Sequence, residues 1–395
     1  MHLDDGTREL AGVLALGDPA ANGRYRAEFR YEGSWLKSQQ GFALDPESLP
    51  LSSGIFAGSN LNPPLGVFND ALPDRWGRAL LLHGYPLSQR SDLLLLTLRG
   101  RNGLGSIEFV EYGTRLVPPN PESTLVLGTL LGAAEKFEAG LPVEDSHLRR
   151  LLAAGTTAGG ARPKATVSDE RGDWIVKFPS KVLDGRFDMI GLEKATMDCA
   201  RAAGIRVPDT RIEYAGAKKV IFVKRFDVTD QRGRHHMISL STLCKERSDY
   251  NVSSYDDLAD AVRKHSANPS DDLARLFTHA VFNGLVGNTD DHLKNFSMLH
   301  DATGYRLAPA YDLLPDTNVN QEHVLFYAGQ RYIDSRATVI DMARRWGIAN
   351  PIEILRDVTG GLSRFREFAE RSAVPDADIA EITRDVDRRI GRVVP

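Results

Sequence analysis

The spacing of apolar and polar residues predicts short strands mainly in the first part of the chain and long helices toward its end. Residues 24–31 alternate as a half-exposed strand does, and short apolar runs predict further strands at 165–167, 174–178 and 220–224. Helical spacing covers residues 123–154, 191–204, 254–264, 271–286, 351–371 and 376–392. An Asp-led helix start is also expected within residues 69–77. Together these patterns predict an α+β fold.

The order of these elements predicts three parts. Residues 1–120 read as a mixed α/β part, and the proline-rich run at 117–121 reads as the linker that follows it. Residues 121–227 form a β-rich part with one helix, and residues 228–395 form a mostly helical part. Because ligand sites favour domain junctions, we expect a ligand between the second and third parts.

Composition and charge restrict the class of protein. Hydrophobic residues make up 42% and charged residues 26% of the 395 residues, which is ordinary for a globular protein. The formal net charge of −4 argues against electrostatic nucleic-acid binding by the whole chain, although a local basic face remains allowed. Two distant cysteines provide neither a disulfide framework nor a zinc site, and both are expected to be buried and reduced. An acidic start without a signal-peptide pattern, and apolar runs too short to span a bilayer, predict a cytoplasmic protein.

The polar segment at residues 287–296 carries the strongest chemical signal. Asp290 and Asn295 lie five residues apart, and Asp312 follows 22 residues after Asp290. Phosphoryl transfer needs such a set, because one carboxylate can orient an attacking hydroxyl while an amide and a second carboxylate hold Mg²⁺ on the phosphates of a nucleotide. Two more residues of the segment would face the phosphates or brace the loop: His292 and Lys294. The alternative is a polar loop after a helix end, but the strand that follows and the second Asp favour the catalytic interpretation.

Glycine and basic residues ahead of this segment could contact the phosphates. Residues 155–164 form a glycine-rich turn, where backbone N–H groups can approach phosphates and Arg162 and Lys164 add positive charge. The spacing is not that of a Walker A loop, and a plain surface turn is an equal alternative. Lys177 lies within the next strand, where a lysine can pair with α/β-phosphates, and Glu193 on the following helix would fix its ammonium group. The alternative for Lys177 is an edge-strand lysine that faces water.

Residues 222–227 end a strand and open the helical part. In a two-lobed kinase the adenine contacts the backbone at this crossing. The alternative is a simple connection between domains, and both interpretations predict the same architecture.

At these residues the chain resembles the HipA family of bacterial toxin kinases. The resemblance rests on the runs at 159–164, 174–179, 223–227, 288–296 and 307–314, and on the N-terminal runs at 68–74 and 103–109. It implies a serine/threonine kinase with an unusual two-lobed fold, in which residues 1–120 are the family's N-terminal subdomain. It implies that Asp290 is the catalytic acid/base and that Asn295 and Asp312 bind the metal. The implied ATP and Mg²⁺ site further includes Gly159, Gly160, Ala161, Arg162, Lys164, Lys177, Lys224, Arg225, Phe226, His292, Lys294 and Tyr311.

The resemblance also implies regulation and partners. Family members autophosphorylate a hydroxyl in the glycine-rich loop, and the matching position is Thr157, with Thr156 beside it, where serine is usual in the best-known member. A phosphate there would bring about −1.5 to −2 charges next to the ATP phosphates and disfavour the closed loop. The implied partners are a helix-turn-helix antitoxin, operator DNA through that complex, and an aminoacyl-tRNA synthetase as substrate, with the glutamate enzyme as the first guess. No membrane partner is implied.

Two other functions stay open at this level. One is a kinase-like regulatory protein that acts mainly with an antitoxin as a transcriptional repressor, and the other is a small-molecule phosphotransferase. The intact Asp290, Asn295 and Asp312 set favours an enzyme, and the N-terminal resemblance weighs against the small-molecule enzyme. The basic C-terminal segment with Arg384, Arg388, Arg389 and Arg392 is expected to be a solvated helix face, with DNA contact as the alternative.

Overall fold

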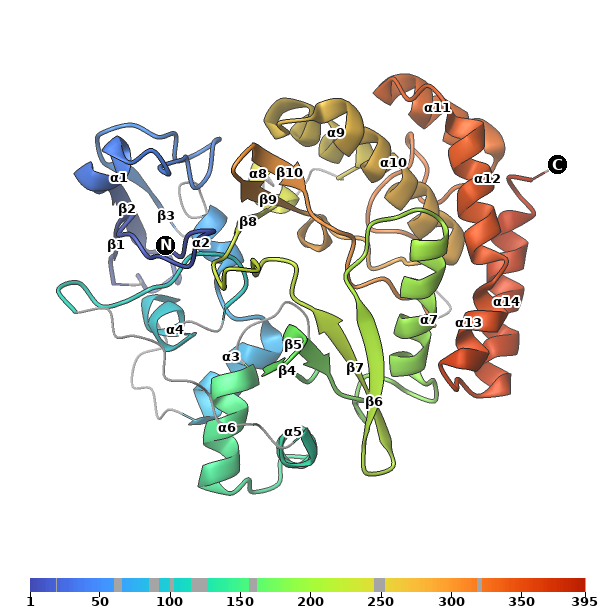
Figure 1. The fold of residues 1–395 in the computed structure, drawn as a ribbon, viewed down its shortest axis with the longest axis horizontal. Helices are drawn as coiled ribbons and strands as arrows, with labels where there is room; N and C mark the ends of the chain where they lie inside the picture. The colour runs from blue at the N-terminus through green and yellow to red at the C-terminus, as the bar shows by residue number, and fades with distance from the viewer. Residues whose placement is uncertain are drawn as a thin grey trace. The chain divides into compact units, whose positions relative to one another are not determined.

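The computed structural model of the chain describes residues 1–18, 20–59, 66–84, 92–99, 103–114, 127–155, 162–244, 253–317 and 322–394. Helices and strands are both abundant, so the α+β prediction is confirmed (Figure 1). The chain packs into two compact units. Unit 1 contains Met1–Leu183, Lys224–Ile238 and Leu299–Asp301, and unit 2 contains Asp184–Val223, Ser239–Met298 and Ala302–Pro395. The predicted boundaries at residues 120 and 227 stay predictions.

Unit 1 begins with a three-stranded antiparallel sheet. Its order is β1 (Gly12–Leu16), β2 (Arg26–Tyr31) and β3 (Phe56–Ser59). Along β2, Phe29 and Tyr31 are buried, whereas Arg26 and Arg30 are exposed. This period of two is what the sequence predicted for the segment, and it places one face of the sheet on the core.

The helices of unit 1 are short. They are α1 (Gly33–Lys37), α2 (Gly66–Asp70), α3 (Arg75–Gly84), α4 (Asp92–Arg99), α5 (Leu127–Glu138) and α6 (Asp145–Gly155). The Asp-led start is confirmed at α3, because the Asp74 carboxylate accepts a hydrogen bond from the Gly77 backbone N–H at 2.6 Å. The helical pattern at 123–154 is divided between α5 and α6. Gly140 lies between them with φ +66°, a conformation that ends a helix.

Two antiparallel hairpins follow, one in each unit. In unit 1, β4 (Lys164–Asp169) pairs with β5 (Gly172–Lys177), and Lys164 lies opposite Lys177. In unit 2, β6 (Thr210–Ala215) pairs with β7 (Lys218–Lys224) up to the last residue of β7, which unit 1 contains. The strands β8 (His236–Ser239) and β9 (Ser297–Asp301) each contain residues of both units, and β10 (Gly304–Leu307) belongs to unit 2. The predicted strands at 165–167, 174–178 and 220–224 all lie in these hairpins.

Unit 2 is mostly helical. Its helices are α7 (Met189–Ala202), α8 (Leu240–Leu243), α9 (Tyr255–His265), α10 (Pro269–Val286), α11 (Arg336–Trp346), α12 (Pro351–Leu362), α13 (Phe365–Arg371) and α14 (Asp376–Ile390), with a 3₁₀ turn at Leu293–Asn295. Helix α10 is central, because it packs against α9, α12 and α14 and is buried along nearly its whole second half. The polar segment that follows α10 therefore starts from a fixed point of the core.

Local signals fix both ends of α10. The Asn268 side chain accepts from the Asp271 N–H, and Pro269 occupies the first turn, where its missing N–H costs nothing. Gly287 ends the helix with φ +80°, a left-handed conformation that favours glycine. A Cβ atom at Gly287 would also lie 2.4 Å from the Arg389 guanidinium carbon, so a larger residue here would force the Arg389 side chain to move.

Two predictions from the sequence are wrong in detail. The single helix expected at 351–371 is two helices, because the chain turns at Ser363 and Arg364 between α12 and α13. Gly361, in the last turn of α12, packs so closely on Cys199 and Ala203 that a Cβ atom would lie 2.7 to 2.8 Å from them. Both cysteines are free, and Cys199 is buried as expected, but Cys244 is only partly buried. Apolar neighbours along the sequence did not guarantee burial, because tertiary packing decides which face of the short helix α8 is covered.

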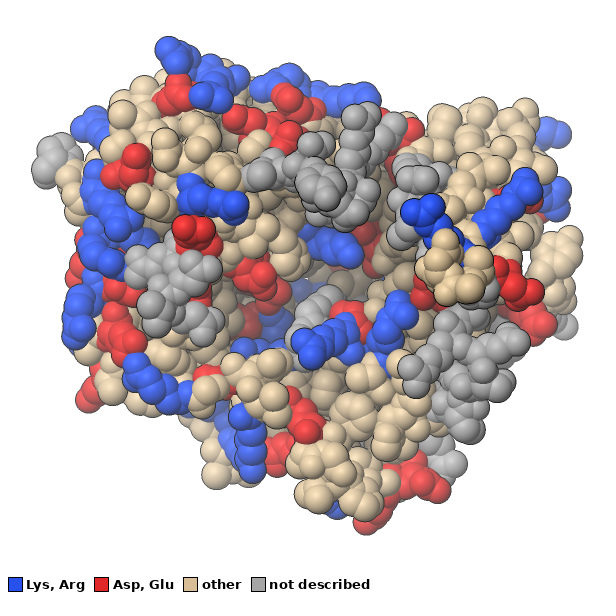
Figure 2. All heavy atoms as spheres, turned by 180° about the vertical axis from the view of Figure 1, so that it is seen from behind, with Lys and Arg blue, Asp and Glu red and all other residues tan. Residues whose placement is uncertain are grey.

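The surface agrees with the near-neutral composition. On the face shown in Figure 2, Lys and Arg residues alternate with Asp and Glu instead of forming one continuous basic patch. Within the described ranges, no helix is both long enough and apolar enough to cross a bilayer.

Candidate active site

The segment after α10 forms a tight loop that presents Asp290. The Asp290 side chain is 80% exposed, and His292 places its Nε2 atom 3.7 Å from the carboxylate. The Asn295 Nδ2 atom donates to the Asp290 backbone oxygen at 2.6 Å, which closes the loop over the 3₁₀ turn. Asp290 is thus an open carboxylate on a loop whose backbone is held in place.

Asp291, the neighbour of Asp290, is fully buried and anchors the loop. Its Oδ2 atom accepts from the hydroxyls of Tyr255 at 2.9 Å and Tyr327 at 3.2 Å and from His323 Nδ1 at 3.0 Å. Its Oδ1 atom accepts from the backbone N–H groups of Val324 at 2.9 Å and Leu325 at 3.3 Å. A buried carboxylate is tolerated because donors surround it. The two adjacent Asp residues therefore have opposite roles, one open to solvent and one structural.

A second layer of side chains supports the same loop. Asn283 Nδ2 donates to the Tyr255 hydroxyl at 3.1 Å, and Asn288 Nδ2 donates to Asn283 Oδ1 at 3.2 Å. The Thr289 hydroxyl donates to the Asp316 carboxylate at 2.6 Å, and the Asp316 N–H donates to the Gly287 oxygen at 2.8 Å. These residues and Asp291 were not among the predicted site residues. The pair of adjacent Asp residues was the one local signal.

The segment that carries Asp312 is tied to the same loop. The Tyr311 hydroxyl donates to the Lys294 backbone oxygen at 3.0 Å and lies 2.7 Å from the Ser297 hydroxyl. At the end of β10, where the segment begins, Arg275 Nη2 donates to the Leu307 oxygen at 2.8 Å. Asp312 itself has φ +57°, which is uncommon for a residue other than glycine. Such conformations cluster at functional sites, where the surrounding structure holds them.

Neighbouring charges affect the protonation of the open carboxylate. Desolvation and three nearby carboxylates raise the pKa of Asp290, whereas His292 lowers it. The three carboxylates belong to Asp312, Asp291 and Asp316. Because 80% of the Asp290 side chain is open to solvent, we attribute the direction mainly to these like charges. A cation among these groups would favour their charged forms.

The donor set fits a hard divalent cation. The Asn295 amide nitrogen is used by the loop, which leaves the carbonyl oxygen Oδ1 for a metal, and Asp312 supplies a carboxylate. Mg²⁺ usually takes one or two protein oxygens together with phosphate oxygens and water. Within the ranges that the structure describes, no three His, Cys, Asp or Glu residues form a complete metal cluster. A site with two protein ligands, completed by phosphate oxygens of a nucleotide, does not require such a three-residue cluster.

In unit 1, the predicted phosphate-contacting lysines lie on one hairpin. Lys164 is 2% exposed and forms an ion pair with Asp74 at 2.9 Å. Burial raises the pKa of Asp74, and the Lys164 ammonium opposes that shift. Lys177 lies directly opposite Lys164 in the antiparallel register, so both side chains are on the same face of the hairpin. Lys177 is half-buried and not fully open to water, and its contact with phosphates stays a prediction.

The predicted adenine-site residues differ from one another in burial. Arg225 is buried and forms an ion pair with Asp227 at 2.6 Å. Its Nη2 atom also donates to the Gly103 oxygen at 2.9 Å, and its backbone N–H donates to the Asp173 oxygen at 2.8 Å. The Arg225 side chain therefore holds unit 1 together. Lys224 is exposed and Phe226 is half-buried, and their role at an adenine site stays a prediction.

Several predicted residues cannot be placed. Thr156, Thr157, Gly159, Gly160 and Ala161 lie outside the described residues, as does the linker predicted at 117–121. Arg162 is half-buried at the start of the β4 hairpin. Glu193 is 1% exposed on α7 in unit 2, whereas Lys177 belongs to unit 1, so the expected ion pair between them stays a prediction.

Comparison with protein families gives two matches. Residues 156–394 match the HipA-like C-terminal domain, and residues 8–110 match the HipA N-terminal domain. Among curated proteins, the chain is 26% identical over 312 residues to Y4mE of Sinorhizobium fredii, covering 72% of this chain and 71% of that protein. It is 24% identical over 320 residues to the serine/threonine-protein kinase toxin HipA of Shewanella oneidensis, covering 72% of this chain and 69% of that protein.

The fold is also that of a solved structure. The HipA chain in a complex of Shewanella oneidensis HipA, HipB and operator DNA matches with a TM-score of 0.69 and 19% identity, over 97% of this chain and 95% of that chain. At this identity the likeness establishes the fold. The C-terminal match covers more than half of the chain and includes Asp290, Asn295 and Asp312. The chain therefore belongs to the HipA family and has the HipA-like α+β fold that its sequence predicted.

Proposed function

We propose that the chain is an ATP- and Mg²⁺-dependent serine/threonine protein kinase that acts as the toxin of a toxin–antitoxin pair. The observation that carries this proposal is the contrast between Asp290 and Asp291. One carboxylate is 80% exposed, and the adjacent one is fully buried and saturated with hydrogen bonds. A general base must be reachable by its substrate and held by its surroundings, and this loop meets both conditions.

The polar residues of the loop after α10 and of the segment that carries Asp312 each have a role in this proposal. Asp290 accepts or orients the proton of the substrate hydroxyl, and Asn295 and Asp312 hold Mg²⁺ through oxygen atoms. When bound, Mg²⁺ neutralises charge that develops on the transferred phosphoryl group. Tyr311 keeps the segment of Asp312 against the loop through Lys294 and Ser297. The left-handed conformation of Asp312 holds its carboxylate in a fixed direction before the nucleotide arrives.

The nucleotide side of the proposal rests on unit 1. Lys177 contacts the phosphates, the turn at 159–164 covers them, and residues 224–226 line the adenine. Lys164 braces the turn through its ion pair with Asp74.

The proposal also includes an antitoxin partner and a protein substrate. A relative is named as a serine/threonine-protein kinase toxin, and the solved structure of similar fold contains HipB and operator DNA. By analogy, we expect a helix-turn-helix antitoxin that brings this chain to operator DNA. The substrate we expect is an aminoacyl-tRNA synthetase, with the glutamate enzyme tested first.

The test is transfer of the labelled γ-phosphate of ATP to a protein in a cell lysate by the full-length chain. Asp290→Asn should lower the rate by about 10²–10⁴-fold, the usual contribution of a positioned acid or base. Asp260→Asn is a matched control, because it removes another exposed carboxylate of unit 2 outside the loop. Equal transfer by Asp290→Asn and wild type would refute the proposal. Transfer to a small molecule only, or to nothing in the wild type, would favour one of the alternatives.

A further inference from the structure

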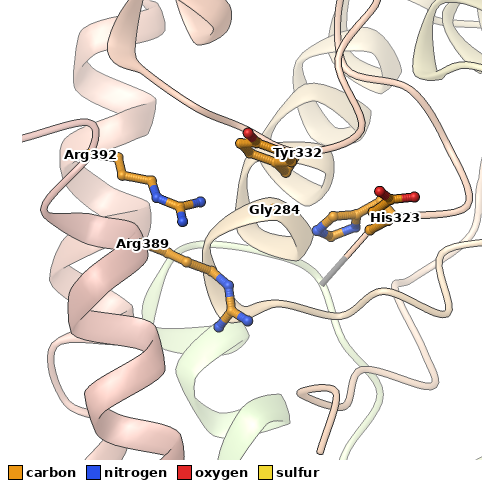
Figure 3. A pocket seen from close by; sticks show the side chains of 6 residues that line it. Gly284, His323, Tyr332, Arg389 and Arg392 are labelled. Carbon is orange, nitrogen blue, oxygen red and sulfur yellow. The ribbon is translucent and has the colours of Figure 1, made fainter. Parts of the chain in front are cut away.

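A cavity of about 220 Å³ lies in unit 2, on the side of α10 that faces α14. It is lined by Gly284, Glu322, His323, Tyr332, Arg389 and Arg392. In Figure 3 the Arg389 side chain points away from Tyr332, and its Nη1 atom donates to the Val286 oxygen at the end of α10. Arg392, which follows the end of α14, lies on the Tyr332 side of the cavity. None of these residues belongs to the catalytic set described above.

The two arginines differ from an ordinary solvated helix face. Arg389 is 6% exposed, so the expectation of a solvated basic face is wrong for this residue. Its recorded hydrogen bond is a long one, from Nη1 to the Val286 oxygen at 3.4 Å. In the part of the chain that the structure describes, no Asp or Glu forms an ion pair with Arg389 or Arg392. Burial lowers the pKa of Arg389, and the carboxylates of Asp385 and Asp316 oppose that shift.

The second arginine lies over an aromatic ring. The Arg392 guanidinium is 5.3 Å from the centre of the Tyr332 ring. This contact orients the guanidinium but leaves its N–H donors free to bind an oxyanion in a bidentate manner. Glu322 is exposed and adds one negative charge against the two guanidinium groups. The net charge of the lining is therefore positive.

We propose that this cavity binds a small oxyanion, a phosphate or carboxylate group of a low-molecular-weight ligand, through Arg389 and Arg392. The volume suits a small ligand, since sites for drug-sized molecules run from about 300 to 1,000 Å³. A nucleic-acid backbone fits less well, because Arg389 is nearly closed to solvent. Among the lining residues, an anion in the cavity would face two guanidinium groups and one carboxylate.

Occupancy of the cavity would reach the catalytic loop by two routes. Arg389 contacts Val286 and lies against Gly287, where α10 ends and the loop begins. His323 lines the cavity and hydrogen-bonds the buried Asp291 carboxylate. Both routes end within a few residues of Asp290. The bound anion would therefore act as a regulator of the loop from a site distinct from the proposed nucleotide site.

The experiment is calorimetric titration of the full-length chain with inorganic phosphate and, separately, with succinate, both in the presence of excess ADP. We expect saturable binding of at least one of the two, with the tighter one identifying the source of the oxyanion. Arg392→Gln should weaken the affinity by about tenfold or more. Arg388→Gln is the matched control four residues earlier, because its side chain pairs with Asp385 outside the cavity, and it should change the affinity by less than about twofold.

A second measurement distinguishes loss of anion binding from unfolding of the variants. Hydrogen exchange of residues 283–297 should slow when the preferred anion is added to the wild type and should not respond in Arg392→Gln. Absence of saturable binding of both anions would overturn the proposal, as would equal weakening by Arg388→Gln and Arg392→Gln. Binding of duplex DNA that depends on Arg392, without binding of either small anion, would also overturn it. None of these readouts needs phosphoryl transfer, so the kinase proposal and this one can fail separately.

Discussion

Replacing Asp291 by alanine tests whether its buried carboxylate holds the loop that presents Asp290. The substitution removes the acceptor for the Leu325 N–H and for His323 Nδ1, both of which are buried. The hydroxyls of Tyr255 and Tyr327 lie 3.4 Å apart and can turn toward each other, so their loss costs less. Each buried donor without an acceptor costs about 1–3 kcal/mol. We therefore expect Asp291→Ala to lower the free energy of unfolding by about 3 kcal/mol.

Two matched variants sharpen this prediction. Asp291→Asn keeps an oxygen for the backbone N–H groups, and the two hydroxyls can turn to accept from its amide, so a loss of about 1–2 kcal/mol is expected. Asp290→Asn changes an exposed carboxylate and should alter stability by less than about 0.5 kcal/mol.

The assay is the thermal midpoint of unfolding. In a domain of about 150–250 residues, 1 kcal/mol corresponds to roughly 2–4 °C, so Asp291→Ala should melt about 6–12 °C below the wild type. A midpoint within about 2 °C of the wild type would show that the hydrogen bonds of Asp291 do not support the loop, and the reasoning would be refuted.

Three further predictions concern other buried or regulatory groups. Burial lowers the pKa of His279 to about 4, below its unfolded value of about 6.5, so the unfolded chain binds the proton more readily between these values. Stability should therefore fall as pH drops from 7 toward 4, by up to about 1.4 kcal/mol per pH unit from this group, and His279→Gln should flatten the curve of melting temperature against pH; an unchanged slope would contradict this. Asp74→Asn should destabilise the chain by about 3 kcal/mol in urea unfolding, because it removes the carboxylate that pairs with the buried Lys164 ammonium, and adding Lys164→Met should recover part of the loss; no recovery would argue against the pair. Thr157→Ala should keep the kinase active for longer during incubation with ATP, measured by phosphate incorporation and by growth arrest, whereas identical time courses would count against the proposed autophosphorylation switch.

The loop at residues 287–296 was accessible from sequence because its signals are local. Gly287 ends a helix through its own backbone preference, and the five-residue spacing of Asp290 and Asn295 allows the amide to close the loop on itself. The partners of Asp291 were not accessible in this way. Tyr255 and Tyr327 are each 36 residues from it, and neither sequence position carries a signal that the two hydroxyls converge on a carboxylate.

For the C-terminal arginines, too, the sequence predicted the helix but not the burial of the side chains. Their helix was predicted from periodicity, because an amphipathic pattern follows from the 3.6-residue turn alone. Whether a given arginine faces water depends on what packs on the helix, and Arg389 is buried because α14 lies against α10. The sequence by itself determined the α+β composition, both ends of α10 and the candidate site residues, since these depend on neighbours within a few residues. Only the tertiary structure decided which of two adjacent carboxylates is open, which arginine is closed and where the cavity lies, because burial and hydrogen bonding there are set by residues far apart in the chain.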